Sequence, residues 1–238
     1  MEPLYIIIPA YNEQENITNI MTEWYSIIET HAQEQTSRLV VIDDGSNDAT
    51  FEMMQEFAKT HPFFVPITQE NAGHGAAIYR GYQYALEAGA AYIFQTDSDG
   101  QTLASEFEDF WQEREETDAL IGSREHRKDG IGRVFVAKVL RLVLWICFSV
   151  RVKDANTPYR LMRAEVLRDE ISYVPKDFFL TNVLLSVLFI KHNRTVKFLP
   201  ITFLNRQGGK NSVNFRKIIA IGRKAFVEFY RMSREKVR

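Results

Sequence analysis

Residues 90–101, Ala90-Ala91-Tyr92-Ile93-Phe94-Gln95-Thr96-Asp97-Ser98-Asp99-Gly100-Gln101, join an apolar run to two carboxylates one residue apart. The run 90–94 predicts a buried strand, and Asp97 and Asp99 follow it in a tight turn. Mg²⁺ and Mn²⁺ favour carboxylates together with substrate phosphates, and ligands of open α/β sheets lie beyond the carboxyl ends of strands. The stretch therefore indicates a metal-bridged substrate that carries phosphate. Because Asp-Ser-Asp-Gly is also good turn chemistry, a simple turn is the alternative.

Around this stretch, strand-like and helix-like segments alternate. Asn12 and Glu15 have the spacing of a capping box for a first helix, and Asp48 can cap a second one. Residues 71–75 open a third helix that ends near Glu87. Short apolar runs predict strands at residues 4–8, 39–42, 64–68, 92–96, 119–122 and 195–204. The alternation predicts an α/β fold with a mostly parallel central sheet and flanking helices.

The composition fits one globular domain with a helical appendage. Of the 238 residues, 45% are hydrophobic and 25% are charged, which allows a substantial core. We expect the domain to cover residues 1–205 and to be followed by a basic amphipathic segment, residues 206–238. Cys147 is the single cysteine of the sequence, so no disulfide can form within it, and a reducing compartment is favoured.

No targeting or membrane-spanning segment is expected. Met1-Glu2-Pro3 leads directly into the first predicted strand, without the basic leader of a signal peptide. A spanning helix needs about 20 apolar residues. Lys138 and Arg141 interrupt the best candidate, residues 134–150. The expected location is therefore cytoplasmic.

The net charge of −2 hides an asymmetry between the two parts of the chain. Residues 206–238 contain ten basic and two acidic residues, so the preceding part is acidic. Within this segment Phe215, Phe226 and Phe229 recur at helical spacing, with basic residues on other faces. The pattern predicts a helix on the inner face of a membrane, with packing on the domain or a homo-oligomer contact as the alternative. The sequence contains no recognition module for nucleic acid.

Polar clusters follow four of the predicted strands, in a specific order. They are Pro-Ala-Tyr-Asn-Glu at 9–13, Asp-Asp-Gly-Ser at 43–46, Asn-x-Gly-x-Gly at 71–75 and Asp-x-Asp at 97–99. Through these motifs the chain resembles the family-2 glycosyltransferases of the GT-A fold, over about residues 4–212. Residues 154–160 and 199–203 resemble in part the signatures of the dolichyl- and polyprenyl-phosphate sugar transferases.

This resemblance implies a nucleotide-sugar donor site. Asp97, Asp99 and Gln101 would hold Mg²⁺ or Mn²⁺ with the diphosphate, and the metal would act as a Lewis acid on the leaving group. The residues that would hold the nucleoside are Pro9, Tyr11, Glu13 and Asp44, together with Asp97. For Glu13, a charge favoured at a helix N-terminus is the alternative.

Three arginines are candidate phosphate ligands, because a guanidinium offers a planar fork of donors to phosphate oxygens. Arg124 follows a predicted strand end, Arg133 precedes a predicted helix and Arg206 precedes a Gly-Gly loop. Each could equally be a solvated surface residue. Gly73 and Gly75 would let a ligand approach the backbone or would serve a turn.

The acceptor is inferred from a missing pair of carboxylates. A sugar hydroxyl must lose a proton during attack, whereas a phosphate monoester, with a second pKa of about 6, can attack unaided. Hydroxyl-using relatives carry a Glu-Asp pair in the region of residues 178–183, and this chain has none there. A polyprenyl phosphate acceptor is therefore favoured, with Asp154 orienting it or acting as base and Asp177 as a second choice. Alternatively, Asp154 pairs with Arg160 for structure.

The sequence thus predicts a metal-dependent, inverting glycosyltransferase that moves a sugar from a nucleotide to a polyprenyl phosphate at the membrane surface. Asp99 and Asp154 are its catalytic candidates. One alternative is a glycosyltransferase acting on a glycan hydroxyl in surface polysaccharide synthesis. The other is a catalytically silent nucleotide-binding scaffold.

Overall fold

The computed structural model describes residues 2–31, 36–124, 131–204 and 215–235. Among these residues, one sheet is formed by β1 (Leu4–Ala10), β2 (Arg38–Asp43), β3 (Phe64–Thr68), β4 (Tyr92–Gln95), β5 (Ala119–Ser123), β6 (Arg160–Arg163) and β7 (Val196–Pro200). The strand order is β3-β2-β1-β4-β6-β5-β7, and only β6 runs antiparallel to its neighbours within this described sheet. The predicted mostly parallel α/β fold is confirmed.

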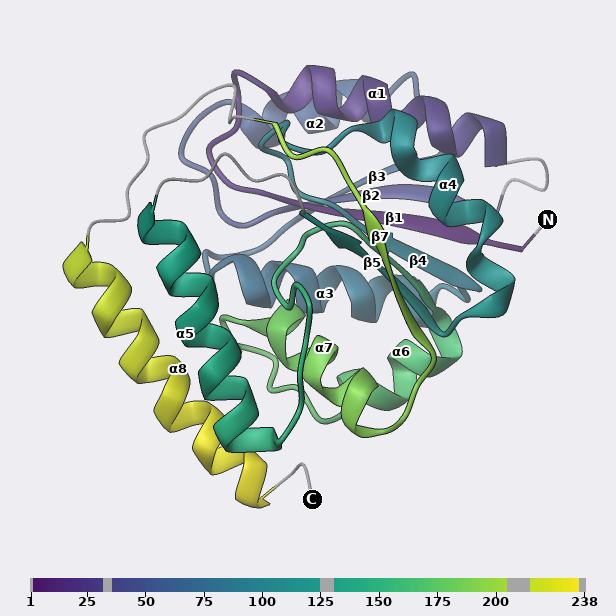
Figure 1. The fold of residues 1–238 in the computed structure, drawn as a ribbon. Helices are drawn as coiled ribbons and strands as arrows, with labels where there is room; N and C mark the ends of the chain where they lie inside the picture. Colours follow the sequence, from purple (N-terminus) through teal and green to yellow (C-terminus); the bar gives the residue numbers. More distant parts are fainter. Residues whose placement is uncertain (1, 32–35, 125–130, 205–214, 236–238) are drawn as a thin grey trace.

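Helices cover both faces of the sheet (Figure 1). One face carries α1 (Ile17–His31), α2 (Thr50–Ala58) and α4 (Phe107–Gln112), with 3-10 turns at Ala104–Glu106 and Arg114–Glu116. The other face carries α3 (His74–Glu87), α6 (Ala164–Ile171) and α7 (Thr181–Lys191). Beside the sheet, α5 (Ile131–Phe148) and α8 (Phe215–Glu235) run next to each other.

The strands divide their side chains between two hydrophobic cores. In β1, Ile6 and Ile8 join the core that contains α1, while Ile7 joins the core that contains α3. All three are fully buried, as expected for a strand whose side chains alternate between two covered faces. Across the first core, Trp24 of α1 stacks on Phe94 of β4 with 5.3 Å between ring centroids. This stack joins α1 to β4 inside the first core.

Several predicted boundaries need correction. The helix expected at residues 134–150 begins at Ile131, so Arg133 lies inside α5 and does not precede it. The strand expected at 195–204 is shorter, Val196–Pro200. The predicted capping box at Asn12 is wrong, because α1 begins at Ile17 and the Asn12 side chain accepts a hydrogen bond from the Asn47 backbone N–H, at 2.8 Å.

The final helix packs on the rest of the protein along one face. Ala225, Phe229 and Met232 of α8 are buried in the core that contains α3. The Phe229 ring lies 5.7 Å from that of Phe148 and 5.6 Å from that of Phe178, between ring centroids. For this face, packing on the domain is the correct alternative. The boundary predicted at residue 205 falls outside the described residues and stays a prediction.

Within the described ranges, no helix has both the length and the apolar character that crossing a bilayer requires.

Candidate active site

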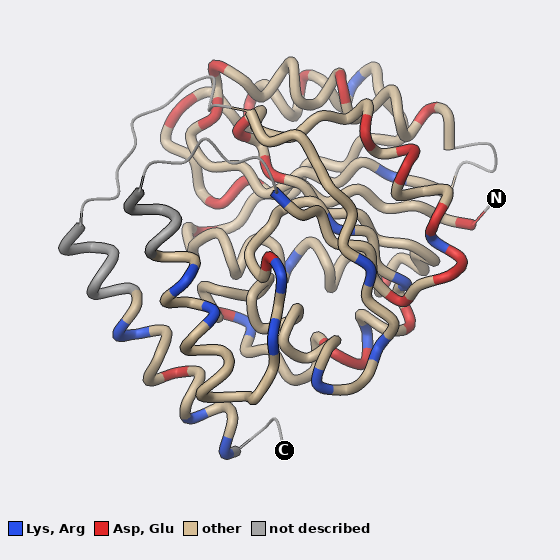
Figure 2. The backbone as a smooth tube through the Cα atoms, viewed as in Figure 1, with Lys and Arg blue, Asp and Glu red and all other residues tan. Residues whose placement is uncertain are grey.

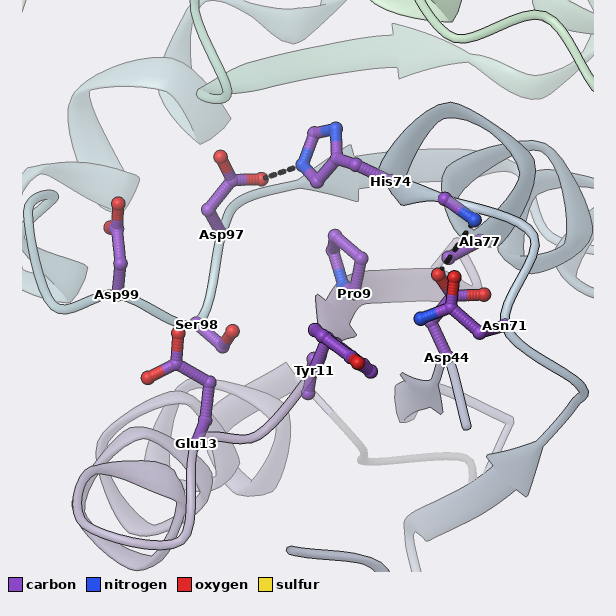
Figure 3. Close-up of a pocket in the computed structure, with 12 residues that line it drawn as sticks. Pro9, Tyr11, Glu13, Asp44, Asn71, His74, Ala77, Asp97, Ser98 and Asp99 are labelled. Atoms are coloured by element: carbon purple, nitrogen blue, oxygen red, sulfur yellow. Dashed lines mark hydrogen bonds and ion pairs between the residues drawn. The ribbon is translucent and has the colours of Figure 1, made fainter. Parts of the chain in front are cut away.

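A pocket of about 390 Å³ opens where β1, β2 and β4 end and α3 begins. It is lined by Pro9, Ala10, Tyr11, Glu13, Asp44, Asn71, Gly73, His74, Ala77, Asp97, Ser98 and Asp99 (Figure 3). Six of the predicted site residues therefore share this cavity: Pro9, Tyr11, Glu13, Asp44, Asp97 and Asp99. Their proximity follows from the topology, since neighbouring parallel strands present their carboxyl ends at one edge of the sheet.

The segment after β1 forms one wall of the pocket. Tyr11 is 45% exposed at the pocket, so its ring is available for stacking on a planar ligand. Glu13 is almost buried, and its carboxylate accepts a hydrogen bond from the Asn16 side chain at 3.1 Å. The Glu13 carbonyl also accepts the backbone N–H of Ile17, the first residue of α1. Glu13 therefore lies both at the pocket and just before a helix, which keeps both of its predicted roles open.

Asp44 shapes the opposite wall through its hydrogen bonds. Its carboxylate accepts the backbone N–H groups of Ala72 and Gly73 at 3.0 and 2.8 Å, and the Gln69 side chain at 2.6 Å. These bonds fold the segment that leads into α3 over the end of β2. Two carboxylate oxygens offer about four acceptor positions, so a ligand hydroxyl or base N–H can still be accepted.

The two glycines of this segment serve the backbone. Gly73 has φ +91°, a conformation that side-chain-bearing residues rarely adopt. At Gly75, a Cβ atom would lie 2.1 Å from the carbonyl oxygen of Phe178. The close neighbour of Gly75 is therefore the Phe178 backbone, and the prediction that a ligand approaches the backbone there is not supported at this position.

Asp97 is held through one of its two oxygens. Its Oδ1 accepts the Gln95 side-chain N–H at 3.0 Å and lies 3.0 Å from Nε2 of His74 (Figure 3). Burial disfavours the charged imidazole, but the carboxylates of Asp97, Asp99 and Asp44 outweigh it and raise the pKa of His74. No described residue forms a hydrogen bond to Oδ2 of Asp97, and the side chain is 23% exposed at the pocket.

Gln101 does not line this pocket in the described structure. Its backbone N–H donates to Oδ1 of Asp99 at 3.1 Å, whereas its side chain donates to the Leu204 carbonyl at 2.8 Å. The Leu204 backbone N–H donates back to the Gln101 carbonyl, also at 2.8 Å. Gln101 thus joins the turn that carries Asp99 to the end of the segment after β7, and a role as metal ligand stays a prediction.

The donor set suits a hard divalent cation that arrives with phosphate. Asp97 and Asp99 both line the pocket, and Oδ2 of Asp97 is open among the described residues. No cluster of three or more His, Cys, Asp or Glu side chains in the described chain forms a complete protein cage for a metal. One or two carboxylates completed by substrate phosphates is the usual arrangement for Mg²⁺, so the residues present fit such an ion.

Arg124 and Asp154 form a bidentate ion pair with each other. Nε and Nη2 of Arg124 donate to the two carboxylate oxygens of Asp154 at 2.8 and 2.7 Å. The Arg124 side chain is 8% exposed, and its guanidinium carbon lies 5.0 Å from the ring centroid of Phe203. Two residues that were predicted to act separately, one on phosphate and one on the acceptor, are thereby brought together.

The alternative partner proposed for Asp154 is engaged elsewhere. Arg160 is fully buried and donates to the backbone carbonyls of Ala155, Thr157 and Asn182 at 3.0–3.1 Å. Its guanidinium therefore connects β6 to α7, and these hydrogen bonds of Arg160 do not include Asp154, which is bonded to Arg124.

Three further site residues were predicted, namely Arg133, Arg206 and Asp177. The side chain of Arg133 and all of Arg206 lie outside the described residues, and Asp177 is exposed. Gln95 and Asn182 were not predicted, although they are buried polar side chains that connect to Asp97. A glutamine at the end of an otherwise apolar strand was the available signal for Gln95.

Comparisons with known proteins identify relatives of this chain. The chain is 29% identical over 178 residues to a dolichyl-phosphate beta-glucosyltransferase of Trichomonas vaginalis, covering 68% of this chain and 52% of that one, so it spans about half of that relative. It is 28% identical over 218 residues to a polyprenol monophosphomannose synthase of Mycolicibacterium smegmatis, covering 88% and 80% of the two chains.

A solved structure has the same fold. Glucosyl-3-phosphoglycerate synthase of Mycobacterium tuberculosis, in complex with Mn²⁺, uridine diphosphate and phosphoglyceric acid, matches 98% of this chain and 79% of its own with a TM-score of 0.63 at 15% identity. The fold is therefore GT-A. The model of the family "Glycosyl transferase family 2" matches residues 5–180, most of the chain. The chain thus belongs to glycosyl transferase family 2.

Proposed function

We propose that the protein is a metal-dependent, inverting glycosyltransferase that moves a sugar from a nucleotide-sugar to a polyprenyl phosphate. The observation that carries the proposal is the shared pocket, which is lined by Asp97 and Asp99 together with Tyr11 and Asp44 (Figure 3). The names of its relatives contain dolichyl phosphate and polyprenol monophosphomannose, which supports the choice of acceptor.

In the proposed reaction the acceptor attacks the anomeric carbon and a nucleoside diphosphate leaves. A divalent cation held by Asp97 and Asp99 would neutralise charge on the leaving diphosphate. Tyr11 and Asp44 would bind the nucleoside, by stacking and by accepting hydrogen bonds. In an inverting reaction the acceptor attacks on the face opposite the leaving group, and a dianionic phosphate needs no base to do so.

Calorimetric binding of GDP, UDP and dTDP, with and without Mn²⁺, tests the donor site. Metal-dependent binding of one nucleotide by the wild type, lost in Asp99→Asn, is the expected result. Binding that ignores both the metal and the substitution, without slow hydrolysis of the nucleotide-sugar, would leave the silent scaffold as the better explanation. If none of the three nucleotides binds, the proposal is overturned.

The acceptor is tested by supplying polyprenyl phosphate with a labelled nucleotide-sugar. We expect label to move into the lipid fraction. The carboxylate oxygens of Asp154 both accept from Arg124, which suits an orienting role better than that of a base. Transfer of label to a glycan hydroxyl, with none to the lipid, would favour the alternative acceptor.

A surface on α5 suits the proposed location at the inner face of a membrane. Leu142, Trp145 and Ile146 are 55%, 52% and 53% exposed. A groove of about 660 Å³ there combines apolar and cationic side chains: Arg141, Leu142, Trp145, Arg151, Val152 and Lys153. Basic residues also recur along the neighbouring α8 (Figure 2). Apolar area and basic charge act together in binding anionic lipid.

Vesicle binding tests this surface. Trp145 is the exposed tryptophan, whereas Trp24 and Trp111 are buried, so its emission should shift to the blue with anionic vesicles and less with zwitterionic ones. The double variant Leu142→Ser, Ile146→Ser should bind about tenfold more weakly, from the lost apolar burial. Tyr173→Ser removes an exposed ring elsewhere and serves as control. Equal binding by all three proteins would exclude this surface.

A further inference from the structure

Behind Asp97, three buried side chains form a continuous hydrogen-bond chain. The Tyr82 hydroxyl of α3 lies 3.3 Å from Oδ1 of Asn182, in the first turn of α7. Nδ2 of Asn182 lies 2.9 Å from Oε1 of Gln95, and Nε2 of Gln95 lies 3.0 Å from Oδ1 of Asp97. Tyr82 and Gln95 are completely buried, and Asn182 is 3% exposed. The chain connects the interior of the protein to the pocket.

The direction of this chain is fixed by its last member. An ionised carboxylate can only accept, so Gln95 must turn its N–H toward Asp97 and its carbonyl oxygen toward Asn182. Asn182 must then donate to Gln95 and accept from Tyr82. Burial raises the pKa of Tyr82, which keeps its hydroxyl protonated and able to donate. Each group thus donates toward Asp97, and aligned hydrogen bonds in a buried setting strengthen one another.

The first turn of α7, which carries Asn182, is hydrogen-bonded to two other elements. The Asn182 carbonyl accepts from Arg160 at 3.0 Å. Its neighbour Thr181 donates to the carbonyls of Gly75 and Phe178, at 3.0 and 2.8 Å. The first turn of α7 is therefore hydrogen-bonded to both α3 and β6. Its residue Asn182 in turn orients the Gln95 side chain.

We infer that Gln95 and Asn182 are positioning residues, which hold Asp97 through Oδ1 and so direct Oδ2 toward the metal and diphosphate. This inference rests on the proposed function. Its structural basis is that both described hydrogen bonds of Asp97 converge on Oδ1, which leaves Oδ2 for a ligand in the pocket. Groups that orient a metal ligand commonly change metal affinity by about 10- to 100-fold when they are removed.

The test compares two variants that break the chain with one that does not. Gln95→Met removes the donor to Asp97 with little change in volume, and Asn182→Leu removes the donor to Gln95. Ser37→Ala is the matched control, because Ser37 is buried and bonds the backbone of Leu4 and His31, at the opposite end of β1 from the pocket. For each protein, the melting temperature and the Mn²⁺ concentration that half-saturates nucleotide binding are measured.

We expect Gln95→Met to need about 10- to 100-fold more Mn²⁺, and Asn182→Leu a similar or smaller excess. Ser37→Ala should lower the melting temperature without changing the Mn²⁺ requirement. Wild-type Mn²⁺ dependence in both Gln95→Met and Asn182→Leu, or an equal change in Ser37→Ala, would overturn the positioning role alone. Absence of metal-dependent nucleotide binding in the wild type would overturn the proposed function, and this inference with it. If one of the variants Gln95→Met and Asn182→Leu fails to fold, the Mn²⁺ requirement of the other decides.

Discussion

The two sides of the sheet supply functional groups in different ways. Toward β3 the strands are parallel, and the segments that follow β1, β2, β3 and β4 all contribute side chains to one pocket. Toward β7 the antiparallel β6 lies between β4 and β5, and the acidic candidate there, Asp154, is joined to Arg124. On the side toward β3, the site follows from the strand topology. On the side toward β7, the arrangement depends on particular side-chain pairs.

The largest expected effect is a loss of stability from a substitution where α3 packs against the segment before α7. Gly75→Ala would set a methyl group against the Phe178 carbonyl, and should lower the free energy of unfolding by about 3 kcal/mol through overpacking. Gly89→Ala is the control, because it has φ +83° but open space around it, and should cost about 1 kcal/mol. Urea unfolding measures both. Equal losses would mean that the contact between α3 and the segment before α7 is not the tight one described.

A second substitution separates the two sides functionally. Arg124→Lys replaces a bidentate partner of Asp154 with a point charge, and we expect lipid-phosphate transfer to fall about tenfold, a loss of ~1.4 kcal/mol. Nucleotide affinity should stay within about twofold, because effects at sites without shared partners are nearly independent. Steady-state transfer and calorimetry provide the two measurements. A parallel loss of nucleotide affinity would break the comparison.

The smallest expected effect is a pH dependence within the pocket. Because the pKa of His74 is raised on folding, its charge stabilises the native state fully below the unfolded pKa of about 6.5. That contribution is lost as the pH rises through the higher folded value. The wild type should therefore melt above His74→Gln at about pH 5.5, and the gap should shrink by about pH 8.5. A gap that stays constant or widens would contradict the described contact with Asp97.

The same contrast explains how far the sequence could be interpreted. Strands β1 to β4 are short apolar runs followed by polar turns, so their existence and the shared pocket were predictable from the strand-end motifs. Helix α7 was missed because it is apolar on nearly every side and has no amphipathic period. Strand β6 was missed because Arg160-Leu161-Met162-Arg163 is short and begins with a charged residue that only its buried carbonyl partners explain.

Pairings between distant residues were the other limit. The sequence of residues 122–160 cannot reveal that Arg124 pairs with Asp154, because this pairing depends on β6 lying beside β5 in the sheet. The hydrogen bond between Asn182 and Gln95 joins residues 87 positions apart. Local sequence patterns carry no information about contacts between residues so far apart in the chain.

The reciprocal contact between Gln101 and Leu204 has a consequence for sequence variation. Both bonds use the backbone of residue 204, while one of them uses the side chain of Gln101. Any residue with a backbone N–H can therefore occupy position 204 at no cost to the contact, and proline alone is excluded chemically. At position 101, glutamate would offer an acceptor where a donor is required. Among related sequences, position 204 should consequently vary much more than position 101.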